Sequence, residues 1–304
     1  MHGQPLGRAI FRSTPEDFQV DEVVDFEPSE EGEHVLLQIR KRDQNTQWVA
    51  GLLSGLAGID RNAVGYCGLK DRFAVTTQWF SLHVPGRELR QQQLRHTDFD
   101  VLSMHRHHKK LRRGMHRGNK FSLVLHDFAV DKQAFSQRIE RIGHCGFPNY
   151  FGEQRFGWRG NNLHKVSELV DQGRLKGNRH STGLYLSAAR SWLFNLTLDA
   201  YLRRGILSLN DSGALWGRGR SPSGAELREL ETAVLKSWTA WCDALEHSGL
   251  QQDRRAFLVR PQNLHFKFVG TDSLKFNFYL PSGTYATALL REIAKLFRPQ
   301  STAL

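Results

Sequence analysis

The sequence predicts an α+β fold in which both ends of the chain build one mixed sheet domain and a helical domain is inserted between them. The first 145 residues alternate strand-like and helix-like patterns, whereas the middle of the chain is mostly helical in pattern. The tail returns to strands but is too short to bury a core alone, so its strands need a sheet to join. With 304 residues for two domains, we expect residues 1–147 and 254–304 to form one domain and residues 148–253 the other.

The sheet domain is expected to take strands from both of its segments. In the strand predicted at 77–84, Gln78, Phe80 and every second residue after them lie on one face, because successive side chains of a strand point to opposite faces. The predicted strands cover residues 20–24, 34–40, 63–66, 77–84, 121–126, 263–269 and 274–280.

Helices are predicted where apolar residues recur at helical spacing. Asn45 and Thr46 are suited to cap the first helix, because their side chains accept hydrogen bonds from unpaired N–H groups. The predicted helices cover residues 48–56, 131–142, 162–172, 187–203, 225–248 and 286–297.

The charge balance favours a polyanionic partner. Lys and Arg number 42 against 31 Asp and Glu, which gives a net charge of +11 and an isoelectric point near 9.8. Nucleic acid is favoured over a membrane, because no basic amphipathic helix stands out and no run of about 18 apolar residues occurs. The N-terminus lacks the apolar core of a signal peptide and the three cysteines are widely separated, so we expect a cytoplasmic protein.

The densest charge lies in the basic segment, residues 105–120. It contains seven Lys or Arg and four His and no acidic residue. Such a run is by default a solvated loop, but sixteen residues without a counter-charge favour an anionic ligand, because cations on phosphates release counterions. A zinc site is disfavoured, because cations flank every histidine. The expected RNA contacts are Lys109, Lys110, Arg112, Arg113, Arg117 and Lys120.

Common cofactor-binding and nucleophile motifs are missing from the sequence. It contains no Walker loop, no G-x-G-x-x-G after a strand, no G-x-S-x-G elbow and no H-E-x-x-H. We therefore expect chemistry by side chains alone, without a nucleotide, flavin or metal cofactor.

One carboxylate, Asp71, stands between Lys70 and Arg72 in a turn with strand-like sequence on both sides. The turn role is the commoner one for an aspartate. The two cations would stabilise its negative charge, and an ionised carboxylate can also act as a nucleophile or general base. Local sequence alone leaves both interpretations open.

The segment from Gly68 to Gln78, GLKDRFAVTTQ, resembles the G-x-K-D-x-x-A-x-T-x-Q signature of the TruD family of tRNA pseudouridine synthases. Six further segments resemble the family in the same order and span nearly the whole chain. They are PEDF at 15–18, EGEH at 31–34, GNKF at 118–121, PNYFGEQRFG at 148–157, LSAARSWLFN at 186–195 and PSGTYAT at 281–287.

The resemblance implies a pseudouridine synthase-type domain with a mixed, mainly antiparallel sheet, interrupted by a mainly helical TRUD insertion. It implies isomerisation of uridine at position 13 of tRNA with Asp71 as the catalytic aspartate and Arg12 as its basic partner. The residues implied to line the uridine pocket are Phe18, Asn119, Phe121 and Tyr285. For Arg155, phosphate contact and a structural role at the domain junction are both open, with the structural role favoured.

Three other functions remain open at this point. The chain could be an RNA-binding protein without catalysis, a pseudouridine synthase acting on another RNA site, or a zinc-dependent nucleic-acid enzyme. We expect a monomer with tRNA as partner, no obligate protein partner and no membrane association.

Overall fold

The computed structural model of the chain describes residues 1–173, 175, 180–205, 207–219 and 224–299. The chain divides into two compact units, a sheet unit and a helical unit. The sheet unit comprises Pro5–Ser136, Pro261–Gly283 and the residues from Ile293 onward. The helical unit comprises Met1–Gln4, Gln137–Arg260 and Thr284–Glu292.

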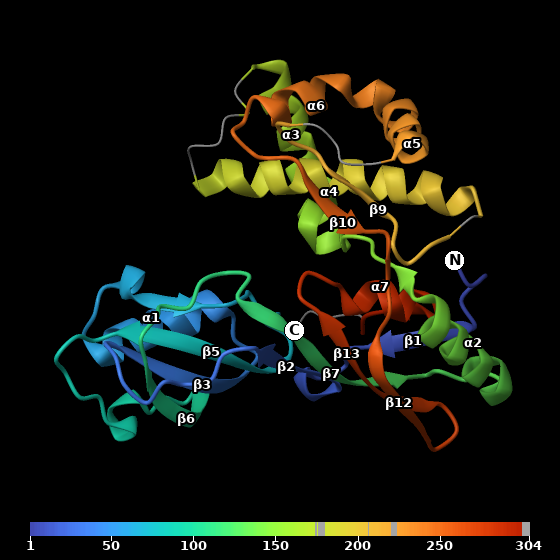
Figure 1. Cartoon of the computed structure of the whole chain (residues 1–304). Helices are drawn as coiled ribbons and strands as arrows, with labels where there is room; N and C mark the ends of the chain where they lie inside the picture. Colours follow the sequence, from blue (N-terminus) through green and yellow to red (C-terminus); the bar gives the residue numbers. More distant parts are fainter. Residues whose placement is uncertain (174, 176–179, 206, 220–223, 300–304) are drawn as a thin grey trace. The chain divides into compact units, whose positions relative to one another are not determined.

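The sheet unit is organised around a ten-stranded sheet with the central order β12-β13-β7-β2-β5-β3-β6 (Figure 1). Its strands are β1 (Gly7–Phe11), β2 (Phe18–Val24), β3 (His34–Arg42), β4 (Val64–Tyr66), β5 (Val75–His83), β6 (Phe99–His107), β7 (His116–His126), β12 (Gln262–Val269), β13 (Ser273–Pro281) and β14 (Ala294–Phe297). Two pairs, β1 with β14 and β2 with β5, are parallel, and the other pairs are antiparallel. The predicted α+β class with a mixed, mainly antiparallel sheet is confirmed.

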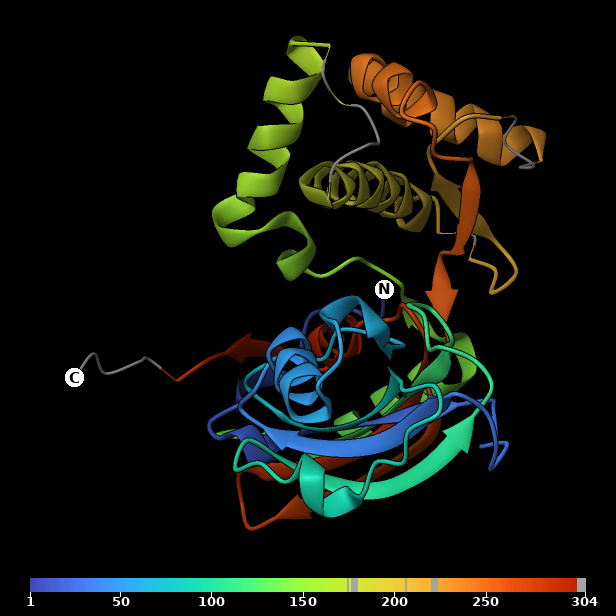
Figure 2. The same ribbon diagram turned by 90° about the vertical axis from the view of Figure 1, so that its left-hand side faces the viewer.

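One helix, α1 (Thr46–Ala57), covers a face of this sheet (Figure 2). It begins as predicted, because the Asn45 side chain accepts a hydrogen bond of 2.7 Å from the Trp48 N–H. Val49 and Leu53 pack against the inward residues of β3 and β5 in a fully buried core. Each such side chain contributes roughly 1.5–3 kcal/mol by leaving water.

The helical unit holds most of the helices and two small strand pairs. Helix α2 (Lys132–Cys145) begins in the sheet unit and ends in this one. The other helices are α3 (Asn161–Asp171), α4 (His180–Arg203), α5 (Ala225–Leu235), α6 (Thr239–Glu246) and α7 (Ala286–Arg291); β8 (Phe147–Pro148) pairs with β11 (Leu258–Val259), and β9 (Ser212–Leu215) with β10 (Asp253–Ala256). Within the described part of the chain, no helix combines the length and apolar character needed to cross a membrane.

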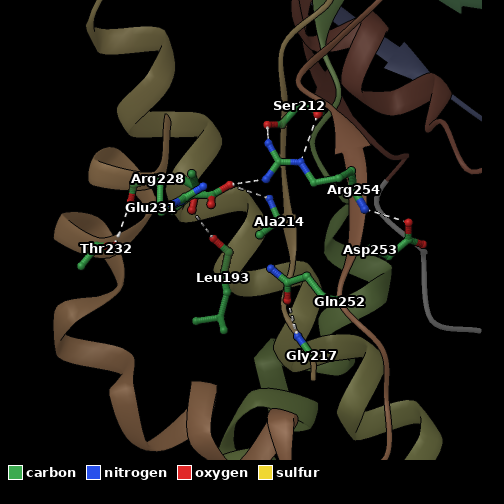
Figure 3. A network of polar contacts seen from close by, with 11 residues as sticks. Leu193, Ser212, Ala214, Gly217, Arg228, Glu231, Thr232, Gln252, Asp253 and Arg254 are labelled. Atoms are coloured by element: carbon green, nitrogen blue, oxygen red, sulfur yellow. Dashed lines mark hydrogen bonds and ion pairs between the residues drawn. The ribbon is translucent and has the colours of Figure 1, made fainter. Parts of the chain in front are cut away.

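A buried ion pair joins α5 to the β9–β10 pair (Figure 3). Arg254 Nη1 lies 2.7 Å from Glu231 Oε1, and the same oxygen accepts a hydrogen bond of 3.0 Å from the Ala214 N–H. The Glu231 side chain is 3% exposed. This carboxylate therefore links helix α5 to β9 and to β10.

Two helix predictions were wrong in part. The helix predicted over 225–248 is interrupted by a 3₁₀ turn at Lys236–Trp238. Leu235 before the turn and Trp241 after it both lie in the same hydrophobic core. The helix predicted over 286–297 ends at Arg291, and β14 follows it. Strand β14 forms because its backbone pairs in parallel with β1 at the other end of the chain, which no local pattern reveals.

Candidate active site

The turn that carries Asp71 joins β4 to β5 and is held by two buried polar side chains. Thr46, at the start of α1, accepts a hydrogen bond from the Lys70 N–H at 2.9 Å and donates to Gln78 Oε1 at 2.9 Å. Gln78 in turn donates to the Gly68 carbonyl at 3.3 Å. These bonds satisfy buried backbone groups and fix both ends of the turn. The sequence predicted Thr46 as a capping residue and Gln78 as a strand and motif residue, but not their role in holding this turn.

A buried lysine supports the turn from β3. The Lys41 ammonium donates to the Asp71 carbonyl at 3.3 Å and also to the Gln44 carbonyl. Lys41 is 1% exposed, and this burial lowers its pKa to about 8. The burial of this residue was not predictable from the sequence, because a lysine in a strand ordinarily points to solvent.

The partner of the Asp71 carboxylate is Arg12, as predicted. Arg12 Nη2 lies 2.6 Å from Asp71 Oδ2, and the Arg12 side chain is 5% exposed while that of Asp71 is 32% exposed. Burial lowers the pKa of the Arg12 guanidinium, and the nearby Asp71 carboxylate acts in the opposite direction. The guanidinium also stacks on Phe18, 3.8 Å from the ring centroid. Arg12 adopts a left-handed backbone conformation, with φ of 59°, a strained geometry of the kind found at functional sites.

The two cations beside Asp71 in sequence have other partners. Arg72 is exposed and lies 3.7 Å from the Asp43 carboxylate. Lys70 lies 2.8 Å from the buried carboxylate of Glu22. Among the described residues, the Asp71 carboxylate therefore forms its ion pair with Arg12, while the two neighbouring cations pair with other carboxylates.

Three of the predicted pocket residues lie in the sheet unit with Asp71. Phe18 and Phe121 meet edge to face with ring centroids 6.1 Å apart, and Phe121 stacks on Phe278 at 5.2 Å. Both rings are less than 10% exposed. Asn119, two residues before Phe121 on β7, accepts a hydrogen bond of 2.6 Å from the Lys70 ammonium. Packing against neighbouring aromatic rings therefore fixes the positions of Phe18 and Phe121.

The fourth predicted pocket residue, Tyr285, belongs to the helical unit. Its hydroxyl accepts a hydrogen bond of 2.9 Å from Arg155 Nη2, and Arg155 Nη1 donates to Ser187 at 3.1 Å. The Tyr285 ring packs edge to face against Phe151. These contacts give Arg155 a structural role within its unit.

The basic segment forms the end of β6, the connection after it and the start of β7. Its side chains divide into two groups. Lys110, Arg113 and Arg117 have protein partners, namely the Asn62 carbonyl, the Tyr66 hydroxyl at 3.5 Å and the Asp25 carboxylate at 3.3 Å. Lys109, Arg112 and Lys120 are exposed, and their side chains make no hydrogen bond or ion pair with any described residue.

Two histidines of this segment have acidic partners in the turn at 27–33. His105 lies 3.0 Å from Glu30, and His108 lies 3.4 Å from Glu31. This turn lies beside the basic segment because β3, which directly follows it, pairs with β6. Within the described residues, no group of three His, Cys, Asp or Glu side chains is arranged to hold a metal ion.

The sequence of this chain is similar to those of known tRNA pseudouridine synthases. A family model described as tRNA pseudouridine synthase D (TruD) matches residues 4–181. The tRNA pseudouridine synthase D of Cellvibrio japonicus is 43% identical, covering 98% of this chain and 93% of that protein. The corresponding protein of Aeromonas salmonicida is 39% identical, covering 100% of this chain and 97% of that one.

A solved structure shows the same fold. The crystal structure from Methanosarcina mazei designated TruD superposes with a TM-score of 0.69 at 20% identity, covering 95% of this chain and 94% of that one. The fold and the resemblance found in the sequence are thereby confirmed, and the chain belongs to the TruD family of tRNA pseudouridine synthases.

Proposed function

We propose that this protein isomerises uridine to pseudouridine at position 13 of tRNA and that Asp71 is the catalytic carboxylate. The curated relatives are named for pseudouridine synthesis in tRNA. The observation that carries the residue assignment is the ion pair at 2.6 Å between the partly exposed Asp71 carboxylate and the buried Arg12. A carboxylate held in this way is oriented by its partner and remains accessible to a ligand.

The reaction needs only a positioned carboxylate. The bond between N1 and C1′ breaks, uracil turns over, and C5 bonds to C1′; the C5 proton is released and N1 takes up a proton. Asp71 either attacks C1′ or removes the C2′ proton to form a glycal that re-engages the base. Because atoms and electrons balance within the nucleotide, we expect no cofactor.

The target uridine must leave its stack to reach Asp71. We propose that Phe18, Asn119 and Phe121 line the pocket that receives it. For Tyr285, which belongs to the helical unit, the pocket role stays a prediction. Asn119 carries the polar group suited to the base edge, and Phe18 and Phe121 supply aromatic rings, the side chains that commonly contact an unstacked base.

Each of the two units has a proposed role, which is based on the residues that it contains. We propose that the sheet unit, which shares most of residues 1–147 and 254–304, is the catalytic domain, and that the helical unit, which includes residues 148–253, is the inserted TRUD domain. The basic segment supplies phosphate contacts. We propose that the protein is a cytoplasmic monomer without an obligate protein partner. Sedimentation of the purified protein tests the monomeric state.

Release of tritium from tRNA labelled at uridine C5 tests the activity. We expect Asp71→Asn to abolish release while tRNA affinity stays within about threefold. Asp43→Asn is the matched control, because Asp43 is also an aspartate of this region but pairs with the exposed Arg72. Release that survives in Asp71→Asn would refute the assignment of Asp71.

Mapping pseudouridine in tRNA from cells with and without the gene tests the target. Loss at position 13 alone is the expected result. Loss at another site would support the alternative of a synthase with a different RNA target, and no loss would support an RNA-binding protein without catalysis.

A further inference from the structure

Lys70 and Glu22 form a buried ion pair next to the proposed catalytic carboxylate. Lys70 Nζ lies 2.8 Å from Glu22 Oε1, and the two side chains are 6% and 0% exposed. The other oxygen, Glu22 Oε2, accepts a hydrogen bond of 3.0 Å from the Trp79 N–H. The parallel pairing of β2 and β5 ends at Asp21 and Thr77, so the Glu22 side chain takes the place of the next backbone partner. Glu22 is therefore fixed by the sheet, and it fixes Lys70.

The same ammonium holds the side chain of Asn119. Glu22 and Asn119 are direct cross-strand partners on β2 and β7, and Lys70 Nζ reaches both, lying 2.6 Å from Asn119 Oδ1. An ammonium group can only donate hydrogen bonds, so the amide oxygen must face Lys70. The amide NH₂ then points away from Lys70, and it makes no hydrogen bond with a described residue.

This arrangement presents a donor of fixed orientation. A free asparagine side chain can rotate by 180° and offer either its oxygen or its NH₂ group. Lys70 removes that choice, because the turned amide would place two donors against each other. A base facing Asn119 must therefore present an acceptor.

Uracil meets this requirement before and after it turns over. Turning about the axis through N3 and C6 exchanges N1 with C5 and O4 with O2, and both exchanged oxygens are acceptors. Cytosine carries an amino group at C4, a donor, where uracil carries O4. Cytosine therefore opposes the Asn119 NH₂ group in one of the two orientations.

We propose that the Glu22–Lys70 pair determines base specificity. It fixes the Asn119 amide with its NH₂ group toward the base, and this orientation selects uracil over cytosine. This inference rests on the proposed function and deepens it. Lys70 and Glu22 are positioning residues, since they act on the base only through Asn119.

Binding to two tRNAs that differ only at the target nucleotide tests the proposal. The measurements use the Asp71→Asn protein, in which turnover does not complicate affinity, with uridine or cytidine at the target position. We expect uridine tRNA to bind about tenfold more tightly, and Lys70→Met to bring the ratio of the two affinities close to one. Lys70→Arg, which keeps a cationic donor, should restore part of the preference.

Arg72→Met is the matched control, because it removes the other cation beside Asp71, and it should keep the full ratio. The double variant Glu22→Gln with Lys70→Met removes the lock without leaving a buried carboxylate unpaired, so it covers poor folding of Lys70→Met. A ratio near one before Lys70 is changed, or an unchanged ratio in Lys70→Met and the double variant, would overturn the proposal.

Tritium release by the wild-type protein separates the two levels of inference. Its absence would refute the proposed function. Its presence together with an unchanged affinity ratio would refute only the role of the Glu22–Lys70 pair.

Discussion

Arg12 and Asp71 form an ion pair at 2.6 Å although 59 residues separate them in the chain. Arg12 directly follows β1 and Asp71 lies in the turn before β5, so the tertiary fold brings them together. The cation is buried and the carboxylate is partly open, which leaves one face of the carboxylate for a ligand.

Arg12→Met should lower kcat/KM for tritium release by about 10²–10³, because it removes a preorganised donor from the reacting carboxylate. Arg12→Lys keeps the charge and should stay within about tenfold of the wild type. Equal losses in the two variants would show that the guanidinium acts by shape and not by charge.

Lys41 should make the stability of the sheet unit depend on pH. Its folded-state pKa of about 8 lies below the ordinary 10.5, so between these values the unfolded chain binds more protons and this group's contribution to stability rises with pH. The stability of wild type minus Lys41→Met should therefore increase by up to about 3 kcal/mol from pH 8 to pH 10.5. Urea unfolding across this range measures it, with Lys267→Met on the surface of β12 as the control. A flat difference curve would contradict the burial of a charged Lys41.

Neutralising Lys109, Lys110, Arg112 and Arg113 together should weaken tRNA binding and flatten its salt dependence. The structure divides this set into matched pairs. Lys109→Gln with Arg112→Gln removes cations that have no partner among described residues, and should reduce the slope of log K against log salt by roughly 1.5. Lys110→Gln with Arg113→Gln removes cations that already bond to Asn62 and Tyr66, and should reduce it less. Equal or unchanged slopes, measured by filter binding, would show that this division does not govern RNA contact.

Glu231→Ala should destabilise the helical unit by about 3 kcal/mol, because it leaves the Arg254 charge and the Ala214 N–H without their buried acceptor. Glu229→Ala is the control, since Glu229 is exposed on the same helix. Urea unfolding and hydrogen exchange at the Ala214 amide provide the readouts. Unchanged exchange at Ala214 would mean that this carboxylate does not hold the β9–β10 pair to α5.

Much of the fold was predictable from periodicity and capping. The Asn45 cap, the alternation along β5 and most helix ends depend on interactions within a few residues. Such short-range interactions can be recognised in the residue pattern. Strand β14 and the break between α5 and α6 were not predictable, because their conformations depend on β1 and on core packing.

The candidate site divides in the same way. The family was recognisable from sequence alone, through motifs that extend from residue 15 to residue 287, and the same motifs pointed to Asp71 and Arg12. Only the folded chain shows that Asp71 pairs with Arg12 and not with its sequence neighbours Lys70 and Arg72. It also reveals four residues that support the site, namely Lys41, Thr46, Gln78 and Glu22. The physical reason is that an ion pair or a buried hydrogen bond depends on distance and direction in space, and strand pairing sets both independently of separation along the chain.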